Sequence, residues 1–185
     1  MLLRETVIVK KVETKNELLK AAEIVYDRYL SAGYIKPNKF NLWITHFQLL
    51  PESEILIALN KEGKILATVS FIDGNRRKVP ADVIFGKQIK SFRKKGIKFC
   101  ELMSLANIGI FDVFAYLMLK LFEELSNRFD LVVIEVNPRR EFVFRRFGFE
   151  LVDQSSDHYL VDAPALLMTS NPKETLNKIK EFLKW

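Results

Sequence analysis

Three apolar segments between residues 98 and 136 constrain the fold of this chain most. Residues 98–106 and 131–136 are short apolar runs, which predicts two buried strands. Residues 111–127 repeat apolar side chains at helical spacing, which predicts a strongly apolar helix between the strands. A strand, a helix and a second strand in this order form a parallel pair joined by a right-handed crossover. We therefore expect a mixed α/β sheet with a parallel pair in its centre.

Elements on both sides of this unit extend the predicted sheet. Residues 6–12 are predicted to be a first strand, and residues 15–30 a helix capped by Thr14 or Asn16. Residues 54–59 and 64–72 are two strands joined by a turn, so the early part of the sheet is antiparallel. The remaining predicted elements are a short helix or loop at 40–49, helices at 81–95, 139–147 and 172–183, and strands at 149–152 and 159–168.

Length and composition narrow the class of protein. The 185 residues match one domain, since domains hold roughly 100–200 residues. Cys100 is the only cysteine, so no disulfide can form within the chain, and a reducing, cytoplasmic location is expected. His46 and His158 are the only histidines and lie far apart in the sequence, so no metal site is expected.

The sequence predicts neither a membrane span nor a secretory signal. No run approaches the ~20 apolar residues that a membrane-spanning helix needs. The first ten residues carry Arg4, Glu5 and Lys10 and have no long apolar stretch.

The net charge of +6 favours an anionic ligand or partner. The positive charge gathers in short clusters at residues 76–78, 90–95, 139–140 and 145–146. Such clusters attract nucleic acid, phosphate-bearing cofactors, acidic membranes or an acidic protein, and each also fits a solvated basic surface. No DNA- or RNA-binding motif accompanies the charge, so nucleic acid is not an expected partner.

The segment 134–150, Ile-Glu-Val-Asn-Pro-Arg-Arg-Glu-Phe-Val-Phe-Arg-Arg-Phe-Gly-Phe-Glu, resembles the acyl-thioester-binding half of the GNAT superfamily. In those proteins a strand is followed by an Asn, then by a short helix, and then by a Gly-Phe-Glu sequence. The resemblance implies that the two parallel strands splay apart and that a pantetheine arm lies in the gap. The short helix would shape the thiol end of the tunnel.

A closer resemblance covers about four-fifths of the chain and consists of motifs that occur in a fixed order. The motifs are Tyr26-x-x-Tyr29, Gly33-Tyr34-Ile35, Leu50-Pro51-Glu52, residues 63–70, Pro80-x-Asp82-x-x-Phe85, residues 101–106, Asn137-Pro138-Arg139 and Ala163-Pro164-Ala165. This set is similar to the long-chain N-acyl amino acid synthases and the related acyl-homoserine-lactone (autoinducer) synthases. It implies an α/β GNAT-like mixed sheet with an antiparallel N-terminal half, a central splayed parallel pair and helices on both faces, in one domain over residues 1–185.

The resemblance implies an N-acyltransferase that moves a medium or long acyl group from an acyl carrier protein, or from acyl-CoA, to the amine of an amino acid or similar acceptor. The acyl-phosphopantetheine or acyl-CoA is then a co-substrate, and no permanently bound cofactor is expected. The loop at residues 107–111 has one glycine, Gly109, where the superfamily has a glycine-rich diphosphate loop, and this favours the carrier protein as donor. Two alternatives remain open: an acetyl-CoA-dependent small-molecule N-acetyltransferase, and a non-catalytic module that binds an acyl carrier protein or a lipid.

The chain departs from the family's pattern at three positions. Arg140 stands where the family commonly has His, and Phe144 stands where it has a Tyr that can protonate the leaving thiolate. Val25 stands where the relatives carry an Arg before the Tyr of the first helix, with Arg28 nearby.

The candidate catalytic residues lie on the strand at 98–106. Glu101 is the candidate base that takes the proton of the amine, and its alternative is an ion-paired structural carboxylate. Ser104 is expected to position water or the acceptor, or else to pack in the core. Backbone N–H groups at the end of this strand are expected to polarise the thioester carbonyl.

Two further sets complete the candidate site. The residues expected to bind the acyl donor and its pantetheine arm are Met103, Leu105, Ala106, Asn107, Asn137, Arg139, Arg140 and Phe144. The residues expected in the acceptor or acyl pocket are Arg28, Tyr29, Tyr34, Trp43, Phe47 and Phe71.

Overall fold

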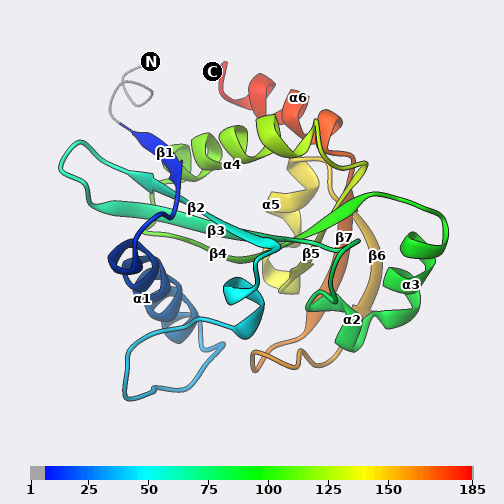
Figure 1. Ribbon diagram of the computed structural model, residues 1–185, viewed down its shortest axis with the longest axis horizontal. Coiled ribbons are helices and arrows are strands. Elements are labelled where there is room, and N and C mark those ends of the chain that lie inside the picture. The colour runs from blue at the N-terminus through cyan, green and yellow to red at the C-terminus, as the bar shows by residue number, and fades with distance from the viewer. Residues whose placement is uncertain (1–6, 185) are drawn as a thin grey trace.

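The computed structural model describes residues 7–184, and within this range the chain forms one open sheet of seven strands (Figure 1). Their order is β1-β2-β3-β4-β5-β7-β6. The strands are β1 (Ile8–Lys11), β2 (Ser53–Leu59), β3 (Ile65–Asp73), β4 (Phe99–Asn107), β5 (Leu131–Val136), β6 (Glu150–Ser155) and β7 (Ala165–Ser170). β4 and β5 are parallel, and all other neighbours are antiparallel. The predicted mixed sheet with its central parallel pair is confirmed. Thr6, the start of the predicted first strand, lies outside the described residues.

Helices cover both faces of the sheet (Figure 1). One face carries α4 (Phe111–Leu125) and α6 (Pro172–Phe182), and the other carries α1 (Lys15–Ser31). The second face is completed by η2 (His46–Leu49), α2 (Ala81–Ile84) and α3 (Gly86–Lys94), which pack around the buried Phe99 and Val133. η3 (Pro138–Arg140) and α5 (Glu141–Arg146) follow β5.

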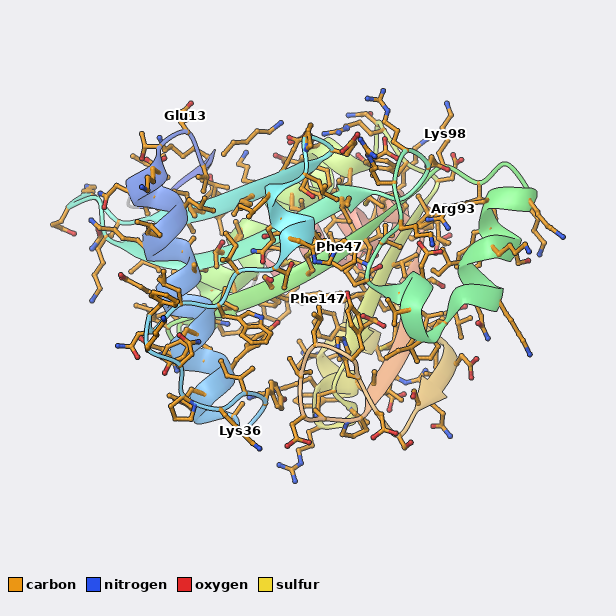
Figure 2. All side chains as sticks on the ribbon, turned by 60° about the horizontal axis from the view of Figure 1, so that its bottom comes forward. Glu13, Lys36, Phe47, Arg93, Lys98 and Phe147 are labelled. Carbon is orange, nitrogen blue, oxygen red and sulfur yellow. The ribbon has the colours of Figure 1, made fainter. Side chains whose placement is uncertain are left out.

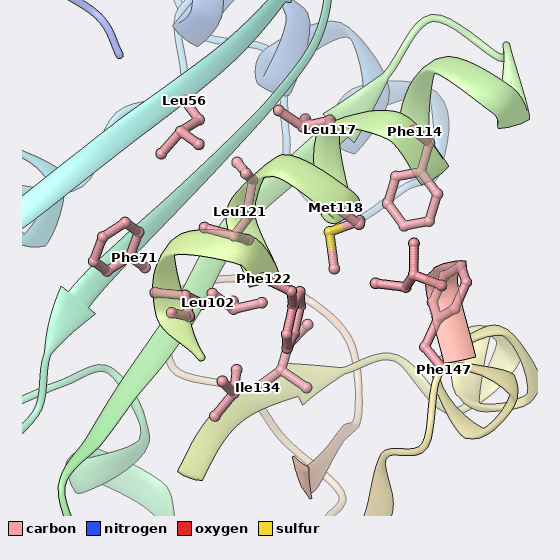
Figure 3. Packing of buried hydrophobic residues seen from close by; sticks show 14 of the residues in the cluster. Leu56, Phe71, Leu102, Phe114, Leu117, Met118, Leu121, Phe122, Ile134 and Phe147 are labelled. Carbon is pink, nitrogen blue, oxygen red and sulfur yellow. The ribbon is translucent and has the colours of Figure 1, made fainter. Parts of the chain in front are cut away.

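The largest group of buried residues lies between the sheet and α4 (Figure 3). Alternation along each strand sends every second side chain to this face. Leu102 and Ile134 point toward α4, where they meet Leu121 and Phe122 (Figure 3). Both strands of the parallel pair are therefore anchored by apolar burial on one side, while their other side is available for polar side chains.

Thr14 rather than Asn16 caps the first helix. Its hydroxyl accepts the N–H of Glu17 at 3.2 Å, and Glu17 Oε2 accepts the N–H of Thr14 at 3.2 Å. This reciprocal capping box satisfies two N–H groups that the helix itself leaves unpaired. The cap sets the start of α1, whose last turns carry Arg28 and Tyr29.

Two predicted elements are corrected by the structure. The predicted helix at 81–95 is broken at Phe85, which leaves the helical region (φ −107°, ψ 33°), and the bend allows Arg93 of α3 to reach Asp82 of α2. The strand predicted at 159–168 is β7, and it begins only at Ala165. The preceding residues form a loop, because Pro164 lacks the N–H that a sheet needs and the apolar Leu160 and Val161 line a cavity instead of a core.

Candidate active site

β4 and β5 separate halfway along their length. Their parallel pairing runs from Phe99 opposite Leu131 to Leu102 opposite Ile134, although both strands continue beyond it. At this point β4 has a β-bulge against β3. Met103 and Ala106, three residues apart on β4, pair with Ser70 and Thr68, which are only two residues apart on β3. Ser104 sits in the bulge with φ 51°, in the left-handed region that non-glycine residues rarely adopt. The predicted splay of the parallel pair is therefore present, and the bulge bends β4 away from β5.

A cavity of about 490 Å³ occupies the gap between the separated strands. Most of the sequence-predicted site residues line it, namely Arg28, Tyr29, Tyr34, Trp43, Glu101, Met103, Ser104, Leu105, Ala106, Asn107, Asn137, Arg140 and Phe144. They come from α1 and its following loop, from β4, and from the turn and short helices after β5. The topology thus brings together residues that lie more than a hundred positions apart in the sequence.

Three sequence-predicted residues do not line this cavity. Phe71 is a correction: it is fully buried on the α4 face, with its ring edge-on to Phe129 at 6.4 Å, because alternation along β3 sends it away from the cavity side. Phe47 is buried in the core between η2 and the sheet, between α1 and α3 in Figure 2. Arg139 is exposed on η3, outside the cavity wall.

Three aromatic side chains form one wall of the cavity. The Tyr29 ring lies edge-on to Tyr34 with centroids 5.8 Å apart and is tilted against Trp43 at 6.1 Å. Burial, with a smaller contribution from Tyr34, raises the pKa of Tyr29 to about 12. The phenol therefore stays neutral at physiological pH, and the wall is aromatic with hydroxyl groups rather than charged.

Glu101 is a buried carboxylate on the β4 side of the cavity. Its side chain accepts the backbone N–H of Ala81 at 2.9 Å, and the residue is 1% exposed. Among residues 7–184 it has no ion pair with a lysine or arginine, so the structural ion-pair reading is not supported. Burial raises the pKa of Glu101 well above its usual value, and the charges of Glu135 and Asp82 raise it further, while the Ala81 N–H and Arg93 lower it. A carboxylate held in this way is a strong base once it is ionised.

Sequence reasoning missed a second buried carboxylate, Glu135, and its partner His158. Glu135 lies on β5, and its Oε2 is 3.0 Å from Nε2 of His158 in the loop before β7. Both line the cavity. The signal that could have found Glu135 is a charged residue inside an apolar strand, because a buried charge requires a partner or a function. The spacing of 23 positions gave no indication of the pair.

Two asparagines shape the turns at the ends of the separated strands. Asn137 Oδ1 accepts the N–H of Arg139 at 3.0 Å and caps η3, as expected for an Asn before Pro. Asn107 Oδ1 accepts the N–H of Gly109 at 2.6 Å in the turn before α4. Both side chains line the cavity, so each turn is fixed by a residue that also faces the site.

Metal clusters and membrane-spanning helices are both absent from the part of the chain that the structure describes. No group of three His, Cys, Asp or Glu side chains in residues 7–184 is placed to hold a metal ion. None of the helices in the same range is long and apolar enough to cross a membrane.

The chain is similar to known acyltransferases in sequence and in structure. The family model of the N-acyl amino acid synthase FeeM matches residues 20–171. No curated protein sequence matches the chain.

Solved structures of acyltransferases share its fold. FeeM, an N-acyl amino acid synthase from uncultured soil microbes, superimposes with a TM-score of 0.78 at 23% identity, over 93% of this chain and 94% of FeeM. The acyl-homoserine-lactone (AHL) synthase LasI has a TM-score of 0.71 at 14% identity, over 95% of each chain. An acyl-CoA N-acyltransferase from Pseudomonas aeruginosa has a TM-score of 0.61 at 13% identity, over 89% of this chain and 98% of the other. These likenesses confirm the GNAT-like fold.

Proposed function

The chain belongs to the N-acyl amino acid synthase FeeM family and is an acyltransferase, and we propose that it transfers a medium or long acyl group from a thioester to the amine of an amino acid or similar acceptor. The observation that carries this proposal is the cavity between β4 and β5. It combines apolar side chains with two buried carboxylates, of which Glu101 is the candidate base.

The size of the cavity favours a long acyl group over an acetyl group. Its volume of about 490 Å³ falls within the ~300–1,000 Å³ of sites that enclose a whole small molecule. Apolar side chains from three elements and the loop before β7 line it, including Leu105, Phe114, Val143 and Leu160. An acetyl group would leave most of this surface uncovered.

The geometry supports aminolysis of a thioester. Glu101 takes a proton from the acceptor nitrogen, whose lone pair then attacks the thioester carbonyl. The carbonyl oxygen is stabilised by backbone N–H groups in the part of β4 that no longer pairs with β5. The C–S bond then breaks, and the sulfur leaves as a thiol by taking a second proton, which the nitrogen releases as the amide forms. Phe144 lines the cavity and has no acidic hydrogen, so it contributes packing rather than a proton to the thiolate.

The turn before α4 favours a carrier protein over CoA as donor. A CoA diphosphate would need free N–H groups at this helix N-terminus. The N–H of Gly109 is already bonded to the Asn107 side chain, and Asp112 places a negative charge in the first turn of α4. The arm of a carrier protein brings one phosphodiester and no adenosine. The exposed Arg139 and Arg140 are suited to that phosphodiester or to an acidic carrier protein.

A donor panel tests the proposal. Thiol release is measured with acyl carrier protein and CoA thioesters of two to sixteen carbons, with and without pooled amino acids. Release that requires an amine and increases with chain length supports the proposal. Release from acetyl-CoA alone would show a small-molecule N-acetyltransferase, and donor binding without release would show a non-catalytic module. CoA donors belong in the panel because one structural neighbour, MesI, is a CoA-dependent acyl-homoserine-lactone synthase.

A further inference from the structure

One oxygen of the buried Glu135 side chain has no partner. The side chain is 4% exposed, and Oε2 lies 3.0 Å from His158 Nε2. Oε1 is buried and makes no hydrogen bond within the described residues. A buried carboxylate oxygen without a partner is unfavourable, because it has lost its hydration and gained no hydrogen bond. The side chain lines the cavity, so a ligand in the cavity is positioned to supply the missing donor.

The hydrogen bonds of His158 determine the charge of this pair. The backbone N–H of Leu160 donates to His158 Nδ1 at 3.0 Å, so that nitrogen is an acceptor and carries no proton. The single proton of the neutral imidazole is then on Nε2 and points at Glu135. The ring is held in place by stacking on Tyr159, with centroids 5.6 Å apart and planes 6° apart. His158 is thus a neutral donor, and the negative charge of Glu135 is not cancelled.

Glu101 brings a second carboxylate to the same face of the sheet. Glu101 is opposite Val133 in the parallel register, and Glu135 is two residues further along β5, so both side chains point to one side. The charge of Glu135 contributes, after burial, to the raised pKa of Glu101. Among residues 7–184 neither carboxylate has a lysine or arginine partner; Arg93, the nearby cation, is bonded to Asp82. The two buried carboxylates therefore lack a counter-ion.

We propose that Glu135, oriented by His158, and Glu101 form a subsite for the ammonium group of the acceptor, which therefore enters the cavity in its charged form. This inference rests on the proposed function, since it assigns the acceptor end of the same cavity. An ammonium group supplies three N–H donors, enough for Glu135 Oε1 and for Glu101.

Binding of the ammonium group prepares the proton transfer. Its positive charge offsets the repulsion between the carboxylates and favours the ionised form of Glu101. One N–H bond of the ammonium then breaks, the proton moves to Glu101, and the electron pair remains on the nitrogen that attacks the thioester. Glu135 holds the nitrogen, while His158 is a positioning residue that acts through Glu135.

A binding experiment tests the subsite without requiring turnover. Affinities of n-hexylammonium and of its neutral counterpart 1-hexanol are measured by calorimetry at pH 7.5. We expect the wild type to bind hexylammonium at least tenfold more tightly than hexanol, and Glu135→Gln to lose this preference while its hexanol affinity is unchanged. Glu150→Gln, at an exposed carboxylate on β6, is the matched control and should behave as wild type. Equal hexylammonium affinity in wild type and Glu135→Gln, or no preference in the wild type, would overturn the proposal.

Kinetics with the amine acceptor test the role of His158. His158→Gln retains a donor for Glu135, and His158→Phe removes it. We expect His158→Phe to raise the acceptor KM at least fivefold with a smaller change in kcat, and His158→Gln to stay near wild type. An unchanged acceptor KM in His158→Phe would show that the histidine is structural. If the wild type released no thiol with any donor, the proposed function would fail, and the calorimetric comparison would still decide the ammonium subsite.

Discussion

Arg93 binds Asp82 with two parallel hydrogen bonds, Nη1 to Oδ1 at 2.6 Å and Nη2 to Oδ2 at 2.7 Å. The pair joins α3 to α2 across the break at Phe85, and Arg93 Nε also donates to the carbonyl of Gly74 at 2.8 Å. α2 in turn presents the Ala81 N–H to Glu101. A surface-facing ion pair is thus connected, through one short helix, to the carboxylate in the cavity.

Replacement of Arg93 is expected to affect both stability and activity. Arg93→Met removes a partly buried bidentate pair and should lower the free energy of unfolding by about 1–3 kcal/mol. It should also reduce thiol release severalfold, because α2 no longer holds Glu101. Urea unfolding and the release assay measure the two effects. Arg76→Met, at a side chain that is 76% exposed, is the control and should change neither.

Glu101→Gln should separate activity from stability. We expect turnover to fall at least tenfold, about 1.4 kcal/mol of barrier, since the amide cannot accept the proton. The folded state raises the pKa of Glu101 above 4.5, mainly by burial. The folded protein therefore binds the proton on the Glu101 carboxyl group more tightly than the unfolded chain does. As a result, the free energy of unfolding decreases as pH rises above about 4.5. Because glutamine does not ionise, Glu101→Gln does not lose stability as pH rises. Its melting temperature at pH 7.5 should therefore be equal to or higher than that of the wild type. Wild-type turnover in this variant would remove Glu101 from the mechanism.

Gly74 has no room for a side chain. A Cβ atom at this position would lie 2.1 Å from Cε2 of the buried Phe99. Gly74→Ala should therefore lower the free energy of unfolding by about 1–3 kcal/mol, as overpacked cores do. Gly86→Ala, where a Cβ meets nothing within 4 Å, should be neutral or slightly stabilising. Equal melting temperatures for the two variants would contradict this packing.

The cap of α1 should make stability depend on pH at the acidic end. The N–H of Glu13, the side chain of Lys10 and the N–H of Thr14 lower the pKa of Glu17 to about 2. The unfolded value is near 4.5, so this contribution is complete above pH 4.5 and is lost as pH falls toward 2. Glu17→Gln should flatten the decline in melting temperature between pH 4.5 and 2.5. An unchanged decline would show that other carboxylates cause it.

The helices and strands that could be predicted from the sequence are those whose apolar residues form a recognisable pattern within the segment itself. The strand–helix–strand unit was predicted because its strands are short apolar runs and its helix repeats apolar side chains at helical spacing, and the hairpin was predicted from its turn. The same reasoning failed at Leu160 and Val161, where apolar residues line a cavity, since hydrophobicity does not distinguish a cavity wall from a core. It also failed to predict the break at Phe85, which brings Arg93 within reach of Asp82.

Some residues of the candidate site could likewise be predicted from the sequence, and others could not. Glu101, Ser104 and Asn137 were predicted from family motifs. They line the cavity because these motifs lie near the point where β4 and β5 separate. Phe71 was misplaced because the face of a strand to which a side chain points depends on register. Glu135 and His158 were missed because a pair formed across two strands and a loop has no signature in the linear sequence.

Mass spectrometry of the products decides whether the chain forms an amide and whether Glu101 is its base. The protein is incubated with a dodecanoyl-loaded acyl carrier protein and pooled amino acids, with Glu101→Gln in parallel. We expect a new species with the mass of one amino acid plus dodecanoic acid less one water, formed by the wild type and at least tenfold less by the variant. Free dodecanoic acid with no amide product, or equal amide from both proteins, would contradict the account.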